Sequence, residues 1–342
     1  MSSLAALALS LFLIVCSHVD GFNKIPSNRV GGRARLDVRM AGNDLRAGSV
    51  VALVTPMNAD MSIDYASLVD LLKWHVVEGT DGAVILGTTG EANMIGPEDR
   101  TKIIQTAVKT VAGAFPIIVG TGTIQTEQVI EMCRNAKDCG ADASLVITPY
   151  YIKPPQRALI KHFWTIADAV DLPMVLYNCP GRTGVDMIPE TVFELSKHKG
   201  IVGIKEATGD LERIPGIRES CGDDFLIYSG EDDSGCQFTS PGVGGDGVIS
   251  VTANVAPAKM HSMLTLSKAG KKEEAEEINA ELELLHSRLF MESNPIPVKK
   301  AVNMMGKCGP AIRQPLAELD ISMEGALNEA LVKGKCLGEE MT

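Results

Sequence analysis

The chain has 342 residues, of which 45% are hydrophobic and 22% are charged, so it can bury a large core and lacks the composition of a disordered, collagen-like or coiled-coil protein. Its formal net charge of -11 disfavours nucleic acid or an anionic membrane as the main partner, because either surface would repel it. The composition favours a globular α/β protein that acts on a small molecule.

The first forty residues differ from the rest of the chain. Residues 4–16 form an apolar run that is too short to span a bilayer but has the length of a signal-peptide core, and residues 21–40 carry five basic side chains against one acidic side chain. We expect residues 1–40 to be a bipartite presequence, a signal peptide followed by a transit peptide, that directs the protein to a plastid (chloroplast stroma). It resembles the presequences of algae whose plastids lie inside extra membranes. The alternative is plain secretion, with the basic stretch as a pro-segment.

Removal of this presequence would change the formal charge of the chain from -11 to -14, because residues 1–40 contain five basic and two acidic residues. No membrane association is expected after processing. The eight cysteines include no C-x-x-C pair, so we expect free thiols and predict neither a metal site nor a redox pair.

Short runs rich in Val, Ile and Leu alternate with longer amphipathic stretches from residue 49 onward. This pattern predicts repeated βα units around a parallel sheet, and eight units in about two hundred residues match a closed (β/α)8 TIM barrel over residues 41–256. An open doubly wound sheet competes, but no G-x-G-x-x-G follows the first strand. The expected strands are residues 50–55, 82–86, 117–120, 144–148, 174–177, 202–205, 226–229 and 247–251, with helices at 64–78 and 97–111 among those between them.

The strand pattern stops after Pro257. The remaining segment, residues 257–342, is predicted to be a C-terminal helical extension. Its expected helices are residues 260–268, 271–291, 296–306 and 321–333.

Reacting groups in a (β/α)8 barrel come from the carboxyl ends of the strands and the loops that follow them. Five strand ends carry suitable residues in this sequence. They are Gly87-Thr88-Thr89-Gly90-Glu91, Thr148-Pro149-Tyr150-Tyr151, Tyr177-Asn178-Cys179-Pro180-Gly181-Arg182-Thr183-Gly184, Lys205-Glu206-Ala207-Thr208-Gly209 and Gly247-Val248-Ile249-Ser250.

Lys205 ends an apolar strand, so its side chain should begin inside the barrel, where a charged ammonium is costly to desolvate. Burial favours the neutral amine, which can attack a ketone carbonyl and form a Schiff base. The alternative is a structural lysine that reaches solvent or pairs with Glu206.

Imine chemistry also requires proton transfer and a means of holding an acidic substrate. Tyr177 and Tyr151 end the two preceding strand units and could move protons through their phenols, although aromatic packing at the barrel rim is the alternative. Thr88 and Thr89 offer hydroxyls in a glycine-rich turn, which could also be an ordinary turn. Arg182 could clamp a carboxylate or could be an ordinary surface arginine.

Together these five segments resemble the pyruvate-dependent class I aldolases, and within them the dihydrodipicolinate synthase family, over nearly the whole chain after residue 48. The resemblance implies a lyase that condenses pyruvate with aspartate semialdehyde in the diaminopimelate route to lysine. Lys205 would form the Schiff base with pyruvate, so that no external cofactor is needed. Tyr177, Thr88 and Tyr151 would form a proton relay, with Tyr151 reaching into the site of a neighbouring subunit of a homotetramer.

The resemblance also assigns the substrate-binding residues. Thr89 and the backbone of Ile249 would hold the pyruvate carboxylate, and Arg182 would receive the carboxylate of aspartate semialdehyde. In sister lyases for N-acetylneuraminate or 2-oxo-3-deoxygluconate the position of Arg182 is not normally arginine, so these activities are the runner-up. A catalytically silent barrel that binds a metabolite is a third hypothesis.

Lysine-inhibited members of the family bind lysine near a subunit interface. The matching positions here are Ala92, Asn93, Pro97, Arg100, Ile124 and Gln128, with Tyr150 retained. An apolar Ile124 and an uncharged Gln128 remove an amide and a carboxylate that would bind a cationic amino acid. We therefore expect weak or absent feedback by lysine.

Overall fold

The computed structural model describes residues 45 and 47–337 of the chain. The expected presequence, residues 1–40, lies outside these described residues. The larger compact unit of the chain, residues 38–342, contains everything that follows.

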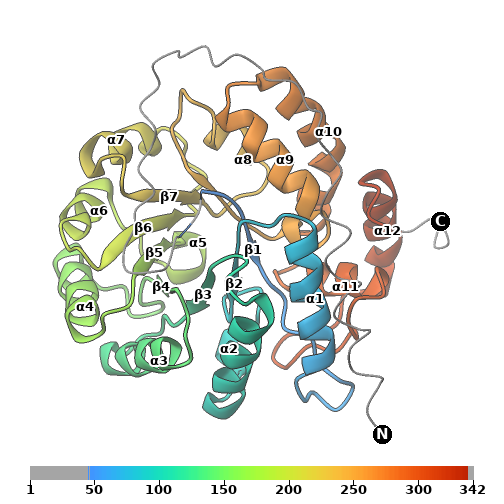
Figure 1. Cartoon of the computed structure of the whole chain (residues 1–342), viewed down its shortest axis with the longest axis horizontal. Helices are drawn as coiled ribbons and strands as arrows, with labels where there is room; N and C mark the ends of the chain where they lie inside the picture. Colours follow the sequence, from blue (N-terminus) through green and yellow to red (C-terminus); the bar gives the residue numbers. More distant parts are fainter. Residues whose placement is uncertain (1–44, 46, 338–342) are drawn as a thin grey trace, which may run out of the picture. The chain divides into compact units, whose positions relative to one another are not determined.

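Eight parallel strands form a closed barrel, in which each strand pairs with the next and β1 pairs with β8 (Figure 1). This closure confirms the predicted (β/α)8 barrel and excludes the open doubly wound sheet. The strands are β1 (Gly48–Ala52), β2 (Gly82–Ile85), β3 (Ile117–Gly120), β4 (Ala143–Ile147), β5 (Met174–Asn178), β6 (Ile201–Glu206), β7 (Leu226–Ser229) and β8 (Gly247–Ser250).

The strands are buried on both faces, which explains why their sequences are continuous apolar runs. Side chains that point into the barrel form one cluster, which includes Val50, Ile118, Val175 and Ile249. Side chains that point outward pack with the surrounding helices in a second, larger cluster. The inner cluster includes Tyr177 at the carboxyl end of β5. Polar groups at this end of the barrel therefore lie directly above apolar side chains.

The helices between the strands surround the barrel (Figure 1). Asp64 caps α1 by accepting a hydrogen bond from the Ser67 amide, and Pro97 opens α2 at the first-turn position that proline favours. The longer helices are α1 (Tyr65–Val77), α2 (Pro97–Val111), α3 (Thr126–Asp138), α4 (Gln156–Ala169), α6 (Pro189–Ser196) and α7 (Arg213–Cys221). Short helices are η1 (Ala92–Met94), α5 (Pro180–Thr183), α8 (Gly235–Phe238) and η2 (Thr252–Asn254).

The remaining helices follow the last strand. They are α9 (Pro257–Lys268), α10 (Lys272–Arg288), α11 (Ile296–Met304), η3 (Ile321–Met323) and α12 (Glu324–Lys333). Helix α9 runs beside α10, and α11 and α12 lie next to one another near α1 in Figure 1. The predicted helix at 321–333 is divided in two, because Asp320 caps a separate 3-10 turn through the Ser322 amide before α12 begins.

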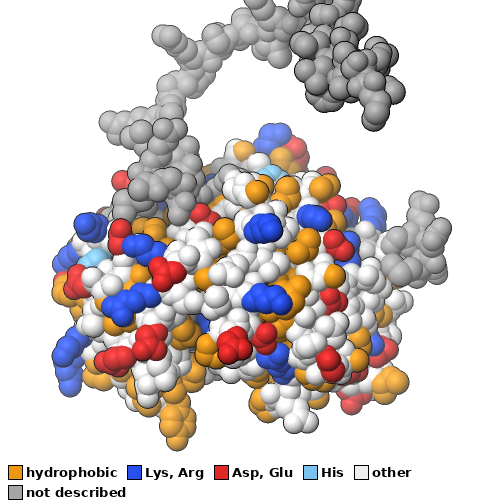
Figure 2. All heavy atoms as spheres, turned by 60° about the horizontal axis from the view of Figure 1, so that its bottom comes forward, with side chains coloured by type: hydrophobic (Ala, Val, Ile, Leu, Met, Phe, Trp, Pro, Cys, Tyr) orange, Lys and Arg blue, Asp and Glu red, His pale blue; other side chains and the backbone are white. Residues whose placement is uncertain are grey.

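The described surface carries mixed charges. On the face shown in Figure 2, lysine and arginine side chains are interspersed with acidic and hydrophobic ones. Within residues 45 and 47–337, no helix combines the length and the apolar character that a membrane span requires. The cysteines in the same part of the chain are free thiols, as expected.

Candidate active site

A cavity of about 70 Å³ lies at the carboxyl ends of the strands. It brings together five residues that the sequence analysis singled out, although they come from three different strand ends. These residues are Thr88, Thr89, Tyr177, Arg182 and Lys205. A space of this size accommodates a ligand of only a few heavy atoms.

Lys205 lies on β6 and is 7% exposed. Its register partner on β5 is Tyr177, and its Nζ lies 4.6 Å from the centre of the Tyr177 ring. Burial lowers the pKa of Lys205 to about 8, against the opposing effect of Cys179, Asp232 and Glu231. Such an amine is neutral far more often than an exposed lysine, and therefore nucleophilic.

A glycine leaves the space that this lysine occupies. A Cβ atom at Gly230 would lie 3.1 Å from Lys205 Cε and 2.5 Å from Ala207 Cβ, so a side chain at this position would displace the lysine. Gly230 follows β7 and lines the cavity.

The structure does not pair Lys205 with Glu206. The Glu206 carboxylate accepts a hydrogen bond of 3.0 Å from Asn178 Nδ2 and lies 3.8 Å from Arg213 Nη2. Alternate residues of a strand face opposite sides of the sheet, so Glu206 belongs to the outer layer of the barrel. Burial raises the pKa of Glu206 to about 7, with Arg213 opposing this effect. The alternative of a lysine neutralised by Glu206 is therefore excluded.

Tyr177 is buried at the end of β5, and burial raises the pKa of its phenol well above the usual value. Its hydroxyl group hydrogen-bonds with Thr88, and this hydrogen bond lowers the pKa of Tyr177, opposing the effect of burial. The phenol therefore remains protonated near neutral pH and is held against a second hydroxyl. This pair can pass a proton to or from an atom in the cavity.

Asn294 lies over the same cavity and was not found by the sequence analysis. It belongs to the segment between α10 and α11, and its Nδ2 donates a hydrogen bond of 3.0 Å to Thr89 Oγ1. Its backbone oxygen accepts a hydrogen bond of 3.3 Å from Arg182 Nη2. Asn294 thus holds both residues that were expected to bind carboxylates. No local pattern marks it, because it is distant from the strand ends in the sequence.

A buried ion pair lies behind the Thr88-Thr89 turn. Glu91, which has a left-handed backbone (φ 58°), places its Oε1 atom 2.5 Å from the Nζ of Lys299 on α11, in the C-terminal extension. Lys299 also donates to the backbone oxygen of Thr55, and Glu91 Oε2 accepts from the Arg313 amide. The C-terminal helices therefore contact the turn that carries two expected site residues.

Two expected site residues are not brought to the cavity in a single chain. Tyr151 is 85% exposed and has a left-handed backbone (φ 71°), which is held by a hydrogen bond from its amide to the Thr183 oxygen. The Ile249 side chain is fully buried in the inner cluster, and Val251, two residues later, lines the cavity instead.

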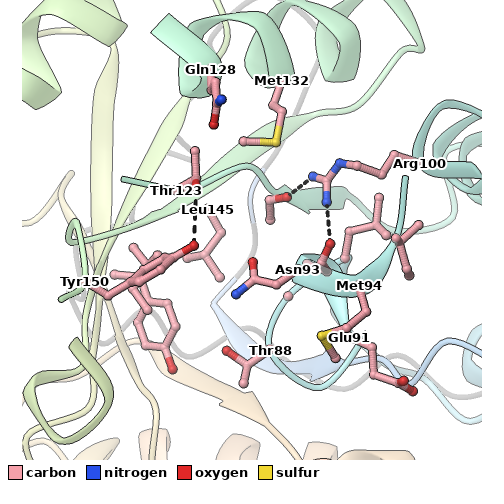
Figure 3. A pocket seen from close by; sticks show the side chains of 18 of the residues that line it. Thr88, Glu91, Asn93, Met94, Arg100, Thr123, Gln128, Met132, Leu145 and Tyr150 are labelled. Atoms are coloured by element: carbon pink, nitrogen blue, oxygen red, sulfur yellow. Dashed lines mark hydrogen bonds between the residues drawn. The ribbon is translucent and has the colours of Figure 1, made fainter. Parts of the chain in front are cut away.

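A second cavity of about 810 Å³ shares Thr88, Tyr177 and Arg182 with the first. Figure 3 shows Gln128 and Met132 on α3 on one side of it and the turn with Thr88 and Glu91 on the other. It is lined by Ala92, Asn93, Pro97, Arg100, Gln128 and Tyr150, six of the seven positions compared with lysine-binding family members. Ile124 does not line it.

The polar groups of this larger cavity are partly engaged with one another. Arg100 donates to the backbone oxygens of Gly120 and Ala92, and Tyr150 hydrogen-bonds with Thr123 at 3.3 Å (Figure 3). In the described part of the chain, no cluster of three or more His, Cys, Asp or Glu side chains is arranged to bind a metal ion.

A closed (β/α)8 barrel with a buried, nucleophilic lysine beside a phenol and a hydroxyl defines a Schiff-base lyase of the class I aldolase type. The model of the Dihydrodipicolinate synthetase family matches residues 45–333. The chain therefore belongs to this family.

Individual relatives agree with this assignment. The 4-hydroxy-tetrahydrodipicolinate synthase of Alcanivorax borkumensis is 52% identical over 83% of this chain and 96% of its own length. The enzyme of the same name from Methylococcus capsulatus is 49% identical over 83% of this chain and 97% of its own length. The structure resembles the chloride-inhibited dihydrodipicolinate synthase of Acinetobacter baumannii complexed with pyruvate, with a TM-score of 0.83 and 42% sequence identity. The match covers 85% of this chain and 99% of that chain. The lysine-bound enzyme of Cyanidioschyzon merolae has a TM-score of 0.82 at 35% identity, with coverage of 86% and 99%.

The predicted plastid location is wrong. The curated relatives named above are bacterial proteins, and bacteria contain no plastids. The prediction depended only on composition, an apolar run followed by basic residues, and such a pattern does not identify a compartment by itself. The family match begins at residue 45, after the segment on which the prediction was based.

Proposed function

We propose that this chain condenses pyruvate with L-aspartate 4-semialdehyde to form 4-hydroxy-tetrahydrodipicolinate, a step of diaminopimelate and lysine biosynthesis. The observation that carries this proposal is the buried Lys205 amine in a small cavity with Tyr177 and Thr88. The synthase name carried by the relatives supports this function over the sister aldolases for N-acetylneuraminate or 2-oxo-3-deoxygluconate. The cluster of reactive groups argues against a silent barrel.

The Lys205 amine begins the reaction by attacking the ketone carbon of pyruvate. Loss of water gives an iminium, which withdraws electrons from the neighbouring methyl group so that a proton leaves and an enamine forms. The enamine carbon then attacks the aldehyde carbon of the second substrate. Tyr177 and Thr88 supply and remove the protons of these steps, and the protein needs no external cofactor because the imine on Lys205 is the electron sink.

Two residues orient the substrates. Thr89 is buried at the cavity wall and would hold the carboxylate of pyruvate, together with the backbone near Ile249. Arg182 borders both cavities, so its guanidinium can receive the carboxylate of aspartate semialdehyde as this substrate enters from the larger cavity.

We further propose that the active form is a homotetramer in which Tyr151 completes the proton relay of a neighbouring subunit. A large aromatic side chain that is 85% exposed is costly in a single chain unless another surface covers it. Ile152 beside it is also exposed. Residues 41–256 would form the catalytic barrel, and residues 257–342 an extension that holds the site together through Asn294 and Lys299.

Reduction with borohydride in the presence of pyruvate tests the central proposal. Mass spectrometry should find one stable pyruvate adduct, and peptide mapping should place it on Lys205. Lys205→Ala should abolish the adduct, whereas Lys161→Ala, at an exposed lysine on α4, should leave it unchanged. The absence of an adduct, or an adduct on another lysine, would refute the proposal. Coupled assays with each acceptor aldehyde then separate the synthase from the sister aldolases.

A further inference from the structure

The segment between α10 and α11 contacts both residues that are proposed to bind carboxylates, and it does so through two different parts of Asn294. The side-chain Nδ2 donates a hydrogen bond of 3.0 Å to Thr89 Oγ1, in a buried contact. The backbone oxygen accepts a hydrogen bond of 3.3 Å from Arg182 Nη2. All three residues line the smaller cavity. A substitution at position 294 therefore changes the contact with Thr89 and keeps the backbone oxygen that Arg182 contacts.

The direction of the hydrogen bond from Asn294 determines what the Thr89 hydroxyl group can offer to a ligand. A hydroxyl group has one hydrogen to donate and two lone pairs that accept. Because an amide nitrogen only donates, Asn294 Nδ2 occupies a lone pair of Thr89 Oγ1 and leaves the hydroxyl hydrogen uncommitted. Among the residues that the structure describes, none accepts this hydrogen. It is therefore available to a negatively charged oxygen in the cavity that Thr89 lines.

The same arrangement occurs between two helices of this chain, with the hydroxyl hydrogen in use. Asn135 Nδ2 on α3 donates a hydrogen bond of 2.9 Å to Thr101 Oγ1 on α2. The Thr101 hydroxyl group in turn donates to the Pro97 backbone oxygen at 3.0 Å. An asparagine that donates to a threonine thus leaves that threonine as a donor to a third group. At Thr89 this third group would be the substrate.

The opposite direction would not suit an acidic substrate. If Thr89 donated its only hydrogen to the side chain at position 294, lone pairs of Oγ1 would face the cavity. The carboxylate of pyruvate only accepts hydrogen bonds, so two acceptors would then meet in a buried site, which is unfavourable.

We propose that Asn294 is a positioning residue, whose side-chain amide fixes the Thr89 hydroxyl group as the donor that binds the carboxylate of pyruvate. Asn294 acts through Thr89 and does not itself hold the substrate. The proposal rests on the proposed function, because it requires that Thr89 binds this carboxylate. It adds that the C-terminal extension determines the affinity of the cavity for pyruvate.

Trapping of pyruvate by cyanoborohydride tests this role without the second substrate. Asn294→Asp keeps the size of the side chain but replaces the donor by an acceptor, so Thr89 would donate to residue 294. The pyruvate concentration that half-saturates trapping should rise at least about tenfold, as expected for the loss of a hydrogen bond to a charged group. An unchanged half-saturating concentration would overturn the proposal.

A cycle of uncharged variants separates this role from an effect of the new charge. Asn294→Leu removes the donor and should raise the half-saturating pyruvate concentration at least about threefold. The same substitution should have its full effect in a Thr89→Ser background, which retains a hydroxyl group. In a Thr89→Val background, which has none, it should change the half-saturating concentration by less than about twofold. Equal effects in the two backgrounds would overturn the proposal, because a general disturbance of the fold does not depend on the hydroxyl group.

The second substrate gives a further readout. In Asn294→Leu the KM for aspartate semialdehyde should change by less than about twofold, because Arg182 still contacts the backbone oxygen of residue 294. If this KM rose as much as the half-saturating pyruvate concentration, Asn294 would support the whole cavity and the proposal would be wrong.

Asn135→Leu is the matched control, since it breaks an asparagine–threonine hydrogen bond of similar length outside the smaller cavity. It should leave the half-saturating pyruvate concentration as in the native chain, and an increase equal to that of Asn294→Leu would overturn the proposal. The native chain separates the two proposals. If it traps no pyruvate on Lys205, the proposed function fails. If it traps pyruvate and the Asn294 variants half-saturate at the native concentration, only this inference fails.

Discussion

The Lys205 amine lies between opposing electrostatic influences. Burial disfavours the ammonium, whereas the nearby Glu231 and Asp232 carboxylates favour it. The result is a pKa of about 8 in place of the usual 10.5. With this value roughly a tenth of the amine is neutral at pH 7, against well under a thousandth for an exposed lysine. The acids therefore limit how far burial can activate this nucleophile.

The rate of imine formation should follow the titration of Lys205. Because the neutral amine reacts, and because its pKa is lowered, the rate of pyruvate trapping should rise with pH through about 8 and level off above it. Glu231 raises the pKa of Lys205, so Glu231→Gln should move the midpoint of this profile to lower pH. Single-turnover trapping with cyanoborohydride between about pH 6 and pH 10 measures both profiles.

Glu219→Gln is the matched control, since Glu219 lies exposed on α7. It should leave the midpoint where the native chain has it. A native midpoint near that of a free lysine, or a shift of the Glu231→Gln profile to higher pH, would contradict this account of the site.

Lysine should inhibit the activity weakly or not at all. The larger cavity presents the Arg100 guanidinium, which repels a cationic amino acid, and an uncharged Gln128. Titration of the condensation rate with lysine should show no inhibition below about millimolar concentration, which corresponds to a binding free energy near -4 kcal/mol. Gln128→Glu should increase lysine sensitivity, because this change places a carboxylate in the cavity lining. Strong inhibition of the native chain by micromolar lysine would refute the prediction.

The candidate reactive residues of the smaller cavity were predictable, because the carboxyl ends of parallel strands meet at one end of a barrel. Lys205, Tyr177 and the two threonines were found in this way. Asn294 was not, since its position depends on how the extension folds back over the barrel. The orientation of Glu206 also needed the structure, because a strand end alone does not show which face each side chain takes.

At the scale of elements, the C-terminal extension supports the turn after β2. Helix α11 contributes Lys299, whose Nζ contacts the Glu91 carboxylate and the Thr55 backbone oxygen in a fully buried arrangement. Glu91 adopts a left-handed backbone conformation that is unfavourable for a non-glycine residue. The ion pair therefore holds a turn that would otherwise relax, and with it Thr88 and Thr89.

Lys299→Met should destabilise the protein and weaken pyruvate binding. The change leaves the Glu91 carboxylate buried beside an apolar side chain, which typically costs about 3–5 kcal/mol. Urea unfolding should show this loss, and the KM for pyruvate should rise because Thr89 is no longer held in place. The double variant Lys299→Met with Glu91→Gln should recover part of the stability, since the unpaired charge is removed.

Lys272→Met is the control for this experiment. Lys272 pairs with Glu276 on the surface of α10, where both side chains are largely exposed, so its loss should change stability by less than about 1 kcal/mol. If Lys299→Met had as small an effect as Lys272→Met, the ion pair would not support the turn.

The order and type of the elements could be predicted from the sequence, because buried parallel strands are short apolar runs and their helices are longer and amphipathic. The predicted bounds of α2 and β3 agree with the structure. The first strand was placed two residues late, because the apolar run continues past Ala52 into a loop that is also buried. The apolar run therefore shows which residues are buried. It does not show where the backbone of the strand stops pairing with its neighbours.

At the scale of the whole molecule, one chain does not assemble the complete proposed relay. Tyr177 and Thr88 meet in the cavity, whereas Tyr151 extends from the surface with its backbone fixed by the Thr183 oxygen. A rigid backbone and an exposed aromatic side chain suit a residue that inserts into a partner surface. The site of each subunit would then contain one residue from another copy.

Mixed oligomers test this arrangement. Lys205→Ala removes the nucleophile, and Tyr151→Phe removes only the hydroxyl group that would act in a neighbouring site, so each variant alone should have very low activity. When the two are unfolded together and refolded, a subunit with Lys205 can receive Tyr151 from the other variant, and activity should return to a fraction of the native value. Refolding each variant separately and then mixing briefly is the control, because without subunit exchange no complete site forms. If the co-refolded sample remained as inactive as this control, although native mass spectrometry showed hybrid oligomers, Tyr151 would not act across an interface.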